Sequence, residues 1–189
     1  MTKDIGGSFS EHSWIPNGVS MIPLTKNTDD RGSLVELFRE EWLGADVAPI
    51  QWNYVSSKPN VLRGIHVHHT HYDYLYMADG MMQLVLVEAR RKSASYGRSI
   101  VVELSATSPS GIVIPPGVAH GFYFPKKAVL IYGVSHYWDI DDEMGCYWND
   151  PALTINWAAK KPLLSERDQK AVSFEQMAED FETKFYGKS

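Results

Sequence analysis

Short apolar runs recur along most of the chain, and within them hydrophobic and polar residues alternate with a period of two. Because successive side chains of a β-strand point to opposite faces, this alternation predicts strands that bury one face. Asp79-Gly80 lies between two such runs and predicts a hairpin turn, since glycine readily adopts the positive φ of tight hairpins. The predicted strands span residues 33–38, 51–56, 62–68, 72–77, 82–88, 99–104, 111–114, 121–124 and 128–137.

One segment late in the sequence has the spacing of a helix instead. Ser173 stands at its start and Gln176 follows three residues later, as in a capping box. Apolar residues then recur at helical intervals, at Phe174, Met177, Ala178, Phe181 and Phe185. We predict a short C-terminal helix that packs this apolar side on the outside of the β-structure.

Many short strands and one helix are typical of a sandwich or barrel, so the predicted fold class is all-β. The 189 residues fit one domain with a sizeable core. No internal repeat or long linker divides the sequence, so we expect a single domain over residues 1–189. The polar residues 1–15 are expected to form a flexible or swapped arm.

Charge and composition exclude some functions. Lys and Arg number 18 against 23 Asp and Glu, and no basic run could neutralise several phosphates in a row, so we expect no nucleic-acid partner. No window approaches the ~18 apolar residues of a membrane helix, and residues 1–16 lack the pattern of a secretory signal. With Cys146 as the only cysteine, no internal disulfide is possible. We therefore expect no membrane partner and a cytoplasmic location.

Most of the histidines lie in one run of the sequence. Between Gly64 and Gly80 the chain carries His66, His68, His69, His71 and Asp73. Because residues two apart in a strand share a face, we expect His66 and His68 to point into the barrel and Val67 to point away. By the same rule, His69 and His71 are expected to point away from His66, toward solvent or a subunit contact.

The spacing of these residues resembles the two sequence signatures of the cupins, which are jelly-roll barrels built as a double-stranded β-helix. His66-x-His68 with Asp73 resembles the first signature, and Pro115-x-Gly117-x2-His120 resembles the second. Taken literally, three histidines and one carboxylate form a metal site that suits iron, manganese, zinc or nickel. One hypothesis is therefore a metal-dependent cupin, an isomerase or a dioxygenase, with the ligands His66, His68, Asp73 and His120.

A longer set of fragments competes with the metal hypothesis. The fragments are DRG at 30–32 with Glu36, QWN at 51–53, VLRGIH at 61–66, VELS at 102–105, IPPGVAHGF at 114–122, Tyr132, WNDPAL at 148–153 and LSERD at 164–168. In order and spacing, over roughly residues 20–170, they resemble the dTDP-4-dehydrorhamnose 3,5-epimerase family of nucleotide-sugar cupins. The resemblance implies a homodimer without metal or cofactor. It also implies that the substrate is a nucleotide-linked 4-keto-6-deoxy sugar, with dTDP as the expected nucleotide, epimerised at C3, C5 or both.

Inversion beside a carbonyl needs a base, a group that stabilises the enolate and an acid on the opposite face. His66 is the candidate base, because the unperturbed pKa of imidazole is close to neutrality. The resemblance implies that Asp168 pairs with His66 and fixes its tautomer. It also implies that Tyr132 acts as the acid on the opposite face.

The substrate-binding residues are expected on several segments. Arg31 and Arg63 suit the pyrophosphate, because a guanidinium offers paired donors to phosphate oxygens. Glu36, Gln51 and Asn53 are expected to contact the base and the sugar hydroxyls, and Trp138 to stack on the pyrimidine. The set of expected substrate-binding residues is completed by Asp73, His120 and Glu143.

Asp73 occupies the position where the resembled family has a lysine that is thought to stabilise the enolate. A carboxylate repels an enolate in a shielded site, because two like charges a few ångströms apart are strongly unfavourable there. His68, His120 or a bound metal are candidate substitutes for the lysine. A third hypothesis follows, in which the chain is a non-catalytic cupin that only binds or presents a nucleotide sugar.

Overall fold

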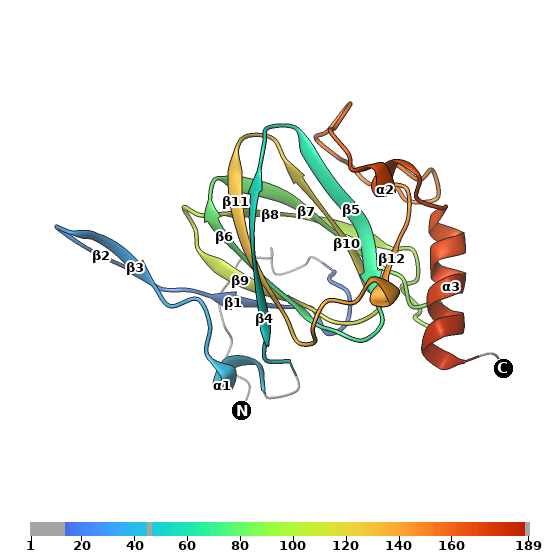
Figure 1. Cartoon of the computed structure of the whole chain (residues 1–189), viewed down its shortest axis with the longest axis horizontal. Coiled ribbons are helices and arrows are strands. Elements are labelled where there is room, and N and C mark those ends of the chain that lie inside the picture. Colours follow the sequence, from blue (N-terminus) through green and yellow to red (C-terminus); the bar gives the residue numbers. More distant parts are fainter. Residues whose placement is uncertain (1–13, 45–46, 188–189) are drawn as a thin grey trace.

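Two five-stranded antiparallel sheets face each other in the computed structural model, which describes residues 14–44 and 47–187 (Figure 1). The first sheet has the order β1-β9-β6-β11-β4, with bounds Ser20–Pro23, Ser110–Ile114, Asp73–Asp79, Ala128–Val134 and Gln51–Ser57. The second has the order β12-β5-β10-β7-β8, with bounds Glu143–Gly145, Val61–His68, Val118–Phe124, Met81–Glu88 and Ser99–Ser105. The predicted all-β jelly-roll is confirmed.

The alternation of side chains along β7 shows how the core forms. Leu84 and Leu86 lie in the cluster of buried side chains between the sheets, whereas Val85 and Val87 lie in a second cluster on the outer face. A strand that is buried on both faces has a continuous apolar sequence, as β7 does. Along β7 the barrel interior is therefore filled by apolar side chains.

Helix α3 (Phe174–Tyr186) covers the second cluster and confirms the predicted C-terminal helix. The hydroxyl of Ser173 accepts a hydrogen bond from the Gln176 backbone N–H at 3.2 Å, which caps the helix. Phe174, Met177 and Phe181 are buried against the outer face of the barrel. Ala178 is buried with them, and the side chain of Phe185 lies outside the described part of the chain.

The sequence pattern missed several short elements. β2 (Lys26–Asp29) pairs with β3 (Gly32–Val35) in a hairpin that projects from the barrel, so the strand predicted over 33–38 is shorter (Figure 1). Because β2 is exposed along its whole length, its sequence carries no alternation. The strand predicted over 128–137 ends at Val134, before the turn η1 (Ile140–Asp142). Two helices of one turn, α1 (Glu40–Leu43) and α2 (Glu166–Gln169), were likewise not predicted.

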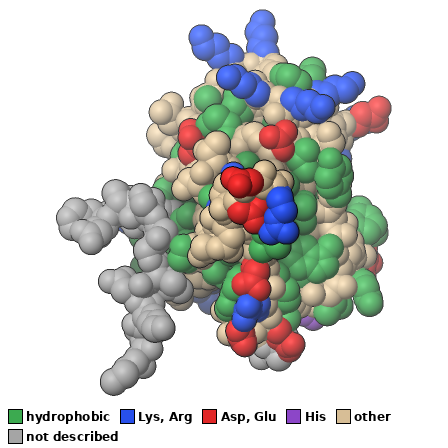
Figure 2. Space-filling model, turned by 90° about the vertical axis from the view of Figure 1, so that its left-hand side faces the viewer, with side chains coloured by type: hydrophobic (Ala, Val, Ile, Leu, Met, Phe, Trp, Pro, Cys, Tyr) green, Lys and Arg blue, Asp and Glu red, His purple; other side chains and the backbone are tan. Residues whose placement is uncertain are grey.

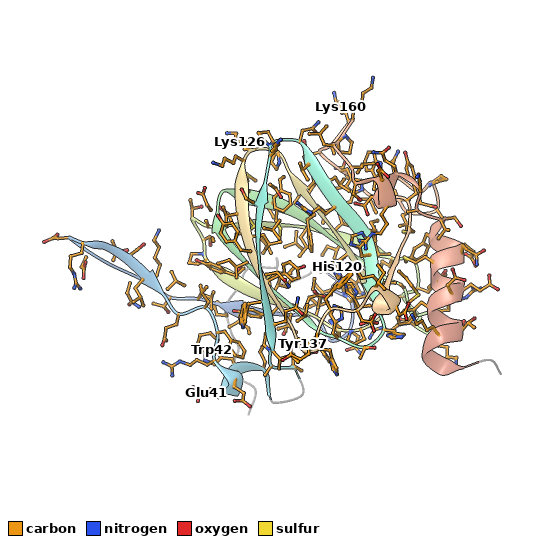
Figure 3. The ribbon with its side chains drawn as sticks, in the orientation of Figure 1. Glu41, Trp42, His120, Lys126, Tyr137 and Lys160 are labelled. Atoms are coloured by element: carbon orange, nitrogen blue, oxygen red, sulfur yellow. The ribbon has the colours of Figure 1, made fainter. Side chains whose placement is uncertain are left out.

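Basic and hydrophobic side chains gather on different parts of the surface. Lys and Arg side chains gather at one end of the face in Figure 2, and Figure 3 labels Lys126 and Lys160 at that end. Hydrophobic side chains lie along the side of the same face that carries β4 (Figure 2).

Within residues 14–44 and 47–187, no helix is long and apolar enough to cross a membrane. Most of the expected arm, residues 1–13, lies outside the described residues.

Gly64 allows β5 and β10 to approach closely where both strands carry site residues. Its φ is +107°, and a Cβ there would lie 2.7 Å from the His120 carbonyl oxygen and 2.8 Å from Gly121 Cα. We expect Gly64→Ala to destabilise the fold by about 3 kcal/mol or more, because backbone strain and a backbone clash add together. Urea denaturation measures the change.

Gly44→Ala is the matched control for this prediction. Gly44 also has a positive φ, +84°, but nothing lies within 4 Å of a Cβ built there. The control isolates the strain of a positive-φ backbone, which is about 1 to 3 kcal/mol for a residue other than glycine. Equal losses in the two variants would show that the approach of β5 to β10 contributes nothing.

Candidate active site

Two adjoining cavities of about 580 and 60 Å³ lie against the inner faces of the sheets. They share four lining residues, His66, Phe122, Tyr132 and Glu143. His66 comes from β5 of one sheet and Tyr132 from β11 of the facing sheet, so the two side chains bound the space from opposite sides. The larger cavity is mostly apolar with a few polar groups, which is the usual make-up of a small-molecule site.

His66 is paired with Asp168 across 102 positions of sequence. The Nε2–H of His66 donates to Asp168 Oδ1 at 2.7 Å, which leaves Nδ1 with the ring's lone pair. Asp168 sits on α2, where the Ser165 hydroxyl accepts from its backbone N–H. Burial favours the neutral form of Asp168, but the hydrogen bonds from His66 and Ser165, together with the positive charge of Arg167, outweigh burial and lower the carboxyl pKa. Asp168 is therefore a carboxylate that can orient the imidazole and stabilise its protonated form.

Tyr132 lines both cavities from the facing sheet. Burial raises the pKa of its hydroxyl, and the nearby Asp73 raises it further. The hydroxyl is therefore protonated at neutral pH and can donate a proton. His66 and Tyr132, predicted separately, border the same space.

Arg63, Glu143 and Arg167 line the larger cavity next to His66. The Arg167 guanidinium contacts the Glu143 carboxylate and lies 2.7 Å from the His66 ring. Because His66 Nε2–H donates to Asp168, this nitrogen has no lone pair left to accept from Arg167. The contact between Arg167 and the His66 ring is therefore electrostatic and not a second hydrogen bond. In the sequence, Arg167 stood only within the fragment LSERD, and no role of its own was predicted for it.

The small cavity is lined by His68, His71, Asp73 and His120. Asp73 Oδ2 lies 3.7 Å from His68 Nε2 and 3.8 Å from the Nε2 atoms of His71 and His120. Burial raises the Asp73 pKa to about 7 and lowers the His120 pKa to about 3. Burial and the two neighbouring rings also lower the His68 pKa well below its usual range. Figure 3 shows His120 between the two sheets.

The expectation that His71 points away from the site is wrong. Its ring is buried, stacks on His68 with centroids 4.0 Å apart, and donates from Nδ1 to Asp142 Oδ2 at 2.7 Å. Burial opposes protonation of His71, but the Asp142 hydrogen bond and the attraction of the nearby Asp73 and Asp142 carboxylates together outweigh it and raise the His71 pKa. Asp142 belongs to η1, and no sequence spacing connected it with the histidines. The expectation for His69 stays a prediction: its side chain lines neither cavity, and its Nδ1 contacts the buried Asp142 carboxylate.

The remaining candidates divide into two groups. Asn53 and Trp138 line the small cavity, and Gln51 donates to Asn53 Oδ1 at 3.1 Å while accepting from the Trp138 backbone N–H at 2.9 Å. Arg31 lies on the projecting β2–β3 hairpin and Glu36 follows it, and neither lines a cavity that contains His66. Within a single chain, all the candidate site residues therefore lie at or next to the two cavities, except Arg31 and Glu36.

The metal-ligand set taken from the cupin signatures is only partly assembled. Among the described residues, His68, Asp73 and His120 place one ligand atom each within 4.8 Å of one another, but His66 does not join this group. His66 is held instead by Asp168. The literal four-residue set is therefore corrected to three.

Comparison with known proteins identifies relatives of one kind. The family model of dTDP-4-dehydrorhamnose 3,5-epimerase matches residues 15–176. The dTDP-4-dehydrorhamnose 3,5-epimerase of Pseudomonas aeruginosa is 34% identical over 154 residues, covering 77% of this chain and 85% of that one. The dTDP-4-dehydrorhamnose 3-epimerase of Streptomyces niveus is 31% identical over 163 residues, covering 82% and 79%.

A solved structure agrees with these sequences. The dTDP-6-deoxy-D-glucose-3,5-epimerase of Legionella pneumophila, in complex with dTDP-4-keto-L-rhamnose, has a TM-score of 0.79 and 29% identity, covering 86% of this chain and 91% of that one. These relatives do not favour a metal-dependent isomerase or dioxygenase. The chain belongs to the dTDP-4-dehydrorhamnose 3,5-epimerase family.

Proposed function

We propose that this protein is an epimerase of a nucleotide-linked 4-keto-6-deoxy sugar, most simply a dTDP sugar, that inverts C3, C5 or both. The observation that carries the proposal is the partly buried His66–Asp168 pair facing Tyr132 across one cavity. A base and an acid on opposite sides of a substrate are what inversion requires. The family relationship supplies the substrate class.

The geometry supports a two-step proton transfer. His66 Nδ1 removes the proton from the carbon next to the carbonyl, and the electron pair of the C–H bond passes into an enolate. Tyr132 then donates its hydroxyl proton to the same carbon from the opposite face, which restores the ketone with inverted configuration. Solvent exchange returns the protonated imidazole and the tyrosinate to their starting states. Asp168 stays ionised and steadies the imidazolium.

The nucleotide is proposed to lie in the larger cavity. Arg63, on the cavity wall, suits the pyrophosphate, and Glu143 suits a hydroxyl of the sugar or nucleoside. Asn53, Gln51 and Trp138 are proposed contacts where the small cavity opens. Asp73 and His120 are proposed to contact the sugar end.

Solvent exchange tests the proposed function. Incubation of a dTDP-4-keto-6-deoxyhexose in D₂O is expected to introduce deuterium at C3, C5 or both, and proton NMR identifies the positions. Because relatives include both 3,5- and 3-epimerases, the labelled positions also decide which centres are inverted. Binding without any label would favour the non-catalytic hypothesis and contradict the proposal.

We expect Arg63→Ala to weaken nucleotide binding by about 2 kcal/mol or more, since a charge-assisted contact to the pyrophosphate is lost. Calorimetry with dTDP measures the dissociation constant. Arg98→Ala is the matched control, because Arg98 is exposed and packs over Trp14 outside both cavities. An unchanged dissociation constant for Arg63→Ala would place the pyrophosphate elsewhere.

A homodimer is part of the proposal. Tyr54 and Trp52 are 70% and 42% exposed on the edge strand β4, and an apolar sheet edge of this kind favours contact with a second copy. The β2–β3 hairpin projects from its own barrel, so Arg31 and Glu36 are proposed to serve the site of the partner (Figure 1). Light scattering at micromolar concentration tests the assembly, and a monomeric mass would contradict it. A cytoplasmic location stays a prediction from the sequence.

A further inference from the structure

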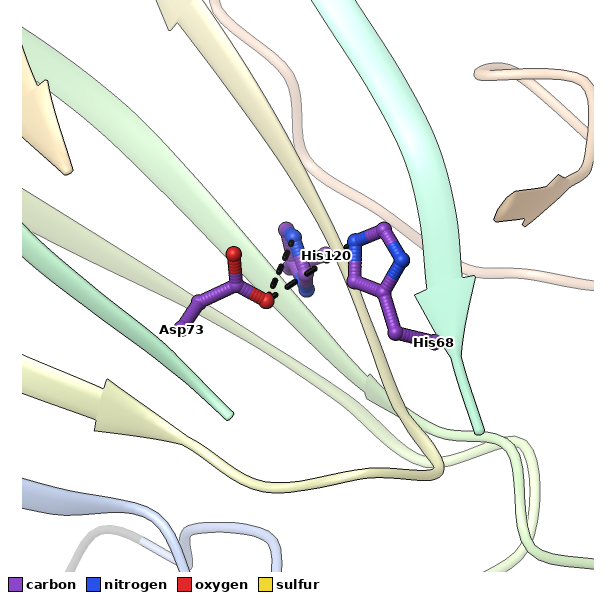
Figure 4. A group of neighbouring side chains, drawn as sticks. All are labelled: His68, Asp73 and His120. Atoms are coloured by element: carbon purple, nitrogen blue, oxygen red, sulfur yellow. Dashed lines mark ion pairs between the residues drawn. The ribbon is translucent and has the colours of Figure 1, made fainter. Parts of the chain in front are cut away.

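We propose that His68, Asp73 and His120 bind one divalent transition-metal ion on the wall of the cavity that also holds His66 and Tyr132. His68 ends β5, Asp73 begins β6 of the facing sheet, and His120 lies on β10. Figure 4 shows the three side chains converging from these strands. The site therefore joins the two sheets along the wall of the small cavity.

The distances fit a site for an ion better than a network of hydrogen bonds. Asp73 Oδ2 is 3.7 Å from His68 Nε2 and 3.8 Å from His120 Nε2, which is too long for a hydrogen bond. Nitrogen and oxygen ligands about 2.1 Å from a tetrahedral ion are about 3.4 Å apart. The two Asp73–histidine distances exceed that spacing by a few tenths of an ångström (~0.3 to 0.4 Å), and the three ligand atoms all lie within 4.8 Å of one another.

The ring nitrogens that face away from Asp73 support this assignment. His120 Nδ1 lies 3.3 Å from the Val118 carbonyl oxygen, and an N–H there leaves the Nε2 lone pair facing Asp73. His68 Nδ1 is buried without a hydrogen-bond partner among the described residues, although the side chain is only 7% exposed. Hydrogen bonding within the fold therefore does not explain the placement of His68.

Asp73 also lacks hydrogen-bond partners among the described residues. Its side chain is 5% exposed, and its carboxylate makes no hydrogen bond to any described residue, although a buried carboxylate normally needs partners. His71 adds a third imidazole nitrogen 3.8 Å from the same oxygen, and Asp142 holds its other ring nitrogen. A histidine oriented by a carboxylate is a common arrangement around metal ions.

The ligand chemistry selects the class of ion. Two imidazole nitrogens and one carboxylate oxygen suit Zn²⁺, Fe²⁺, Mn²⁺ or Ni²⁺, whereas Ca²⁺ and Mg²⁺ prefer oxygen ligands alone. A bound ion would supply positive charge at the position where the resembled family has lysine. That consequence rests on the proposed function, but ion binding itself does not, because it is measured without a sugar nucleotide.

The test uses the full chain, freed of metal by a chelator and titrated with Zn²⁺ in a calorimeter. We expect one ion per chain for the wild type, and at least 100-fold weaker binding for Asp73→Asn and His120→Asn. Co²⁺ provides a second readout, because coordination by the site produces visible absorption bands that the two variants should lose. Thermal melting of the metal-free variants shows whether each is folded.

His136→Asn is the control, since His136 is exposed and outside the cluster, and its affinity should equal that of the wild type. A wild type that binds no Zn²⁺ would overturn the proposal even if both variants failed to fold. Equal binding by wild type and Asp73→Asn would overturn it as well, because the ion would then lie elsewhere. Deuterium exchange into the sugar, measured without added metal, tests the proposed epimerase independently of Zn²⁺ binding. Failure of one of the two proposals therefore does not contradict the other.

Discussion

Replacing His66 by Asn is expected to lower the rate of deuterium incorporation into the 4-keto sugar by about 10³-fold or more, since general-base catalysis contributes about 10² to 10⁴. The substitution removes the imidazole held by Asp168, whereas the proposed nucleotide contacts lie on other residues. The dissociation constant for dTDP should therefore stay close to that of the wild type. Mass spectrometry of the sugar and calorimetry with dTDP measure the two quantities.

Two further variants sharpen the result for His66. Asp168→Asn should slow exchange by about 10- to 100-fold, because an amide oxygen still accepts from the ring but no longer stabilises its protonated form. His136→Asn should have no effect, since His136 is exposed and lines neither cavity. Exchange at the wild-type rate in His66→Asn would remove this residue from the mechanism.

Tyr132→Phe is expected to separate exchange from inversion. His66 can still remove a proton and return a deuteron to the same face, so label should continue to enter the sugar. Delivery from the opposite face needs the Tyr132 hydroxyl, so inversion should slow by about 10²-fold. NMR coupling constants of the sugar ring report the configuration at the labelled carbon.

The matched control for Tyr132 is Tyr147→Phe, which also removes one hydroxyl. Tyr147 is 40% exposed and lines neither cavity, so exchange and inversion should both continue at wild-type rates. Inversion at the wild-type rate in Tyr132→Phe would assign the opposite-face acid to another group.

Local patterns in the sequence were sufficient for most of the barrel. β4 alternates between partly buried and exposed positions because it presents one face to the core, and α3 begins where Ser173 caps it. The pattern failed at β2, where the whole strand is exposed and there is no buried face to mark. Periodicity reports burial, so an exposed hairpin carries no signal of this kind.

The active-site candidates likewise divide into those that followed from the residue itself and those that needed information from distant parts of the chain. The identity of His66 as a base followed from its chemistry, but Asp168 and Tyr132 were named only through the family resemblance. Asp168 is 102 positions away from His66 in sequence, and no local spacing connects residues that far apart. Arg31 and Glu36 were expected at the site, yet one chain leaves both on a projecting segment (Figure 1).

The sequence by itself determined the all-β fold, the C-terminal helix and the clustering of histidines near one end of a strand. Only the tertiary structure decided which of these histidines share a cavity. His68 ends β5, so the rule that alternate residues share a face stops applying before His71, and the following turn carries that ring inward. Asp142 then fixes His71 from a turn 71 positions later. Strand alternation depends only on residues that are neighbours in the sequence, whereas the contact between β5, β6, β10 and η1 depends on how the two sheets pack.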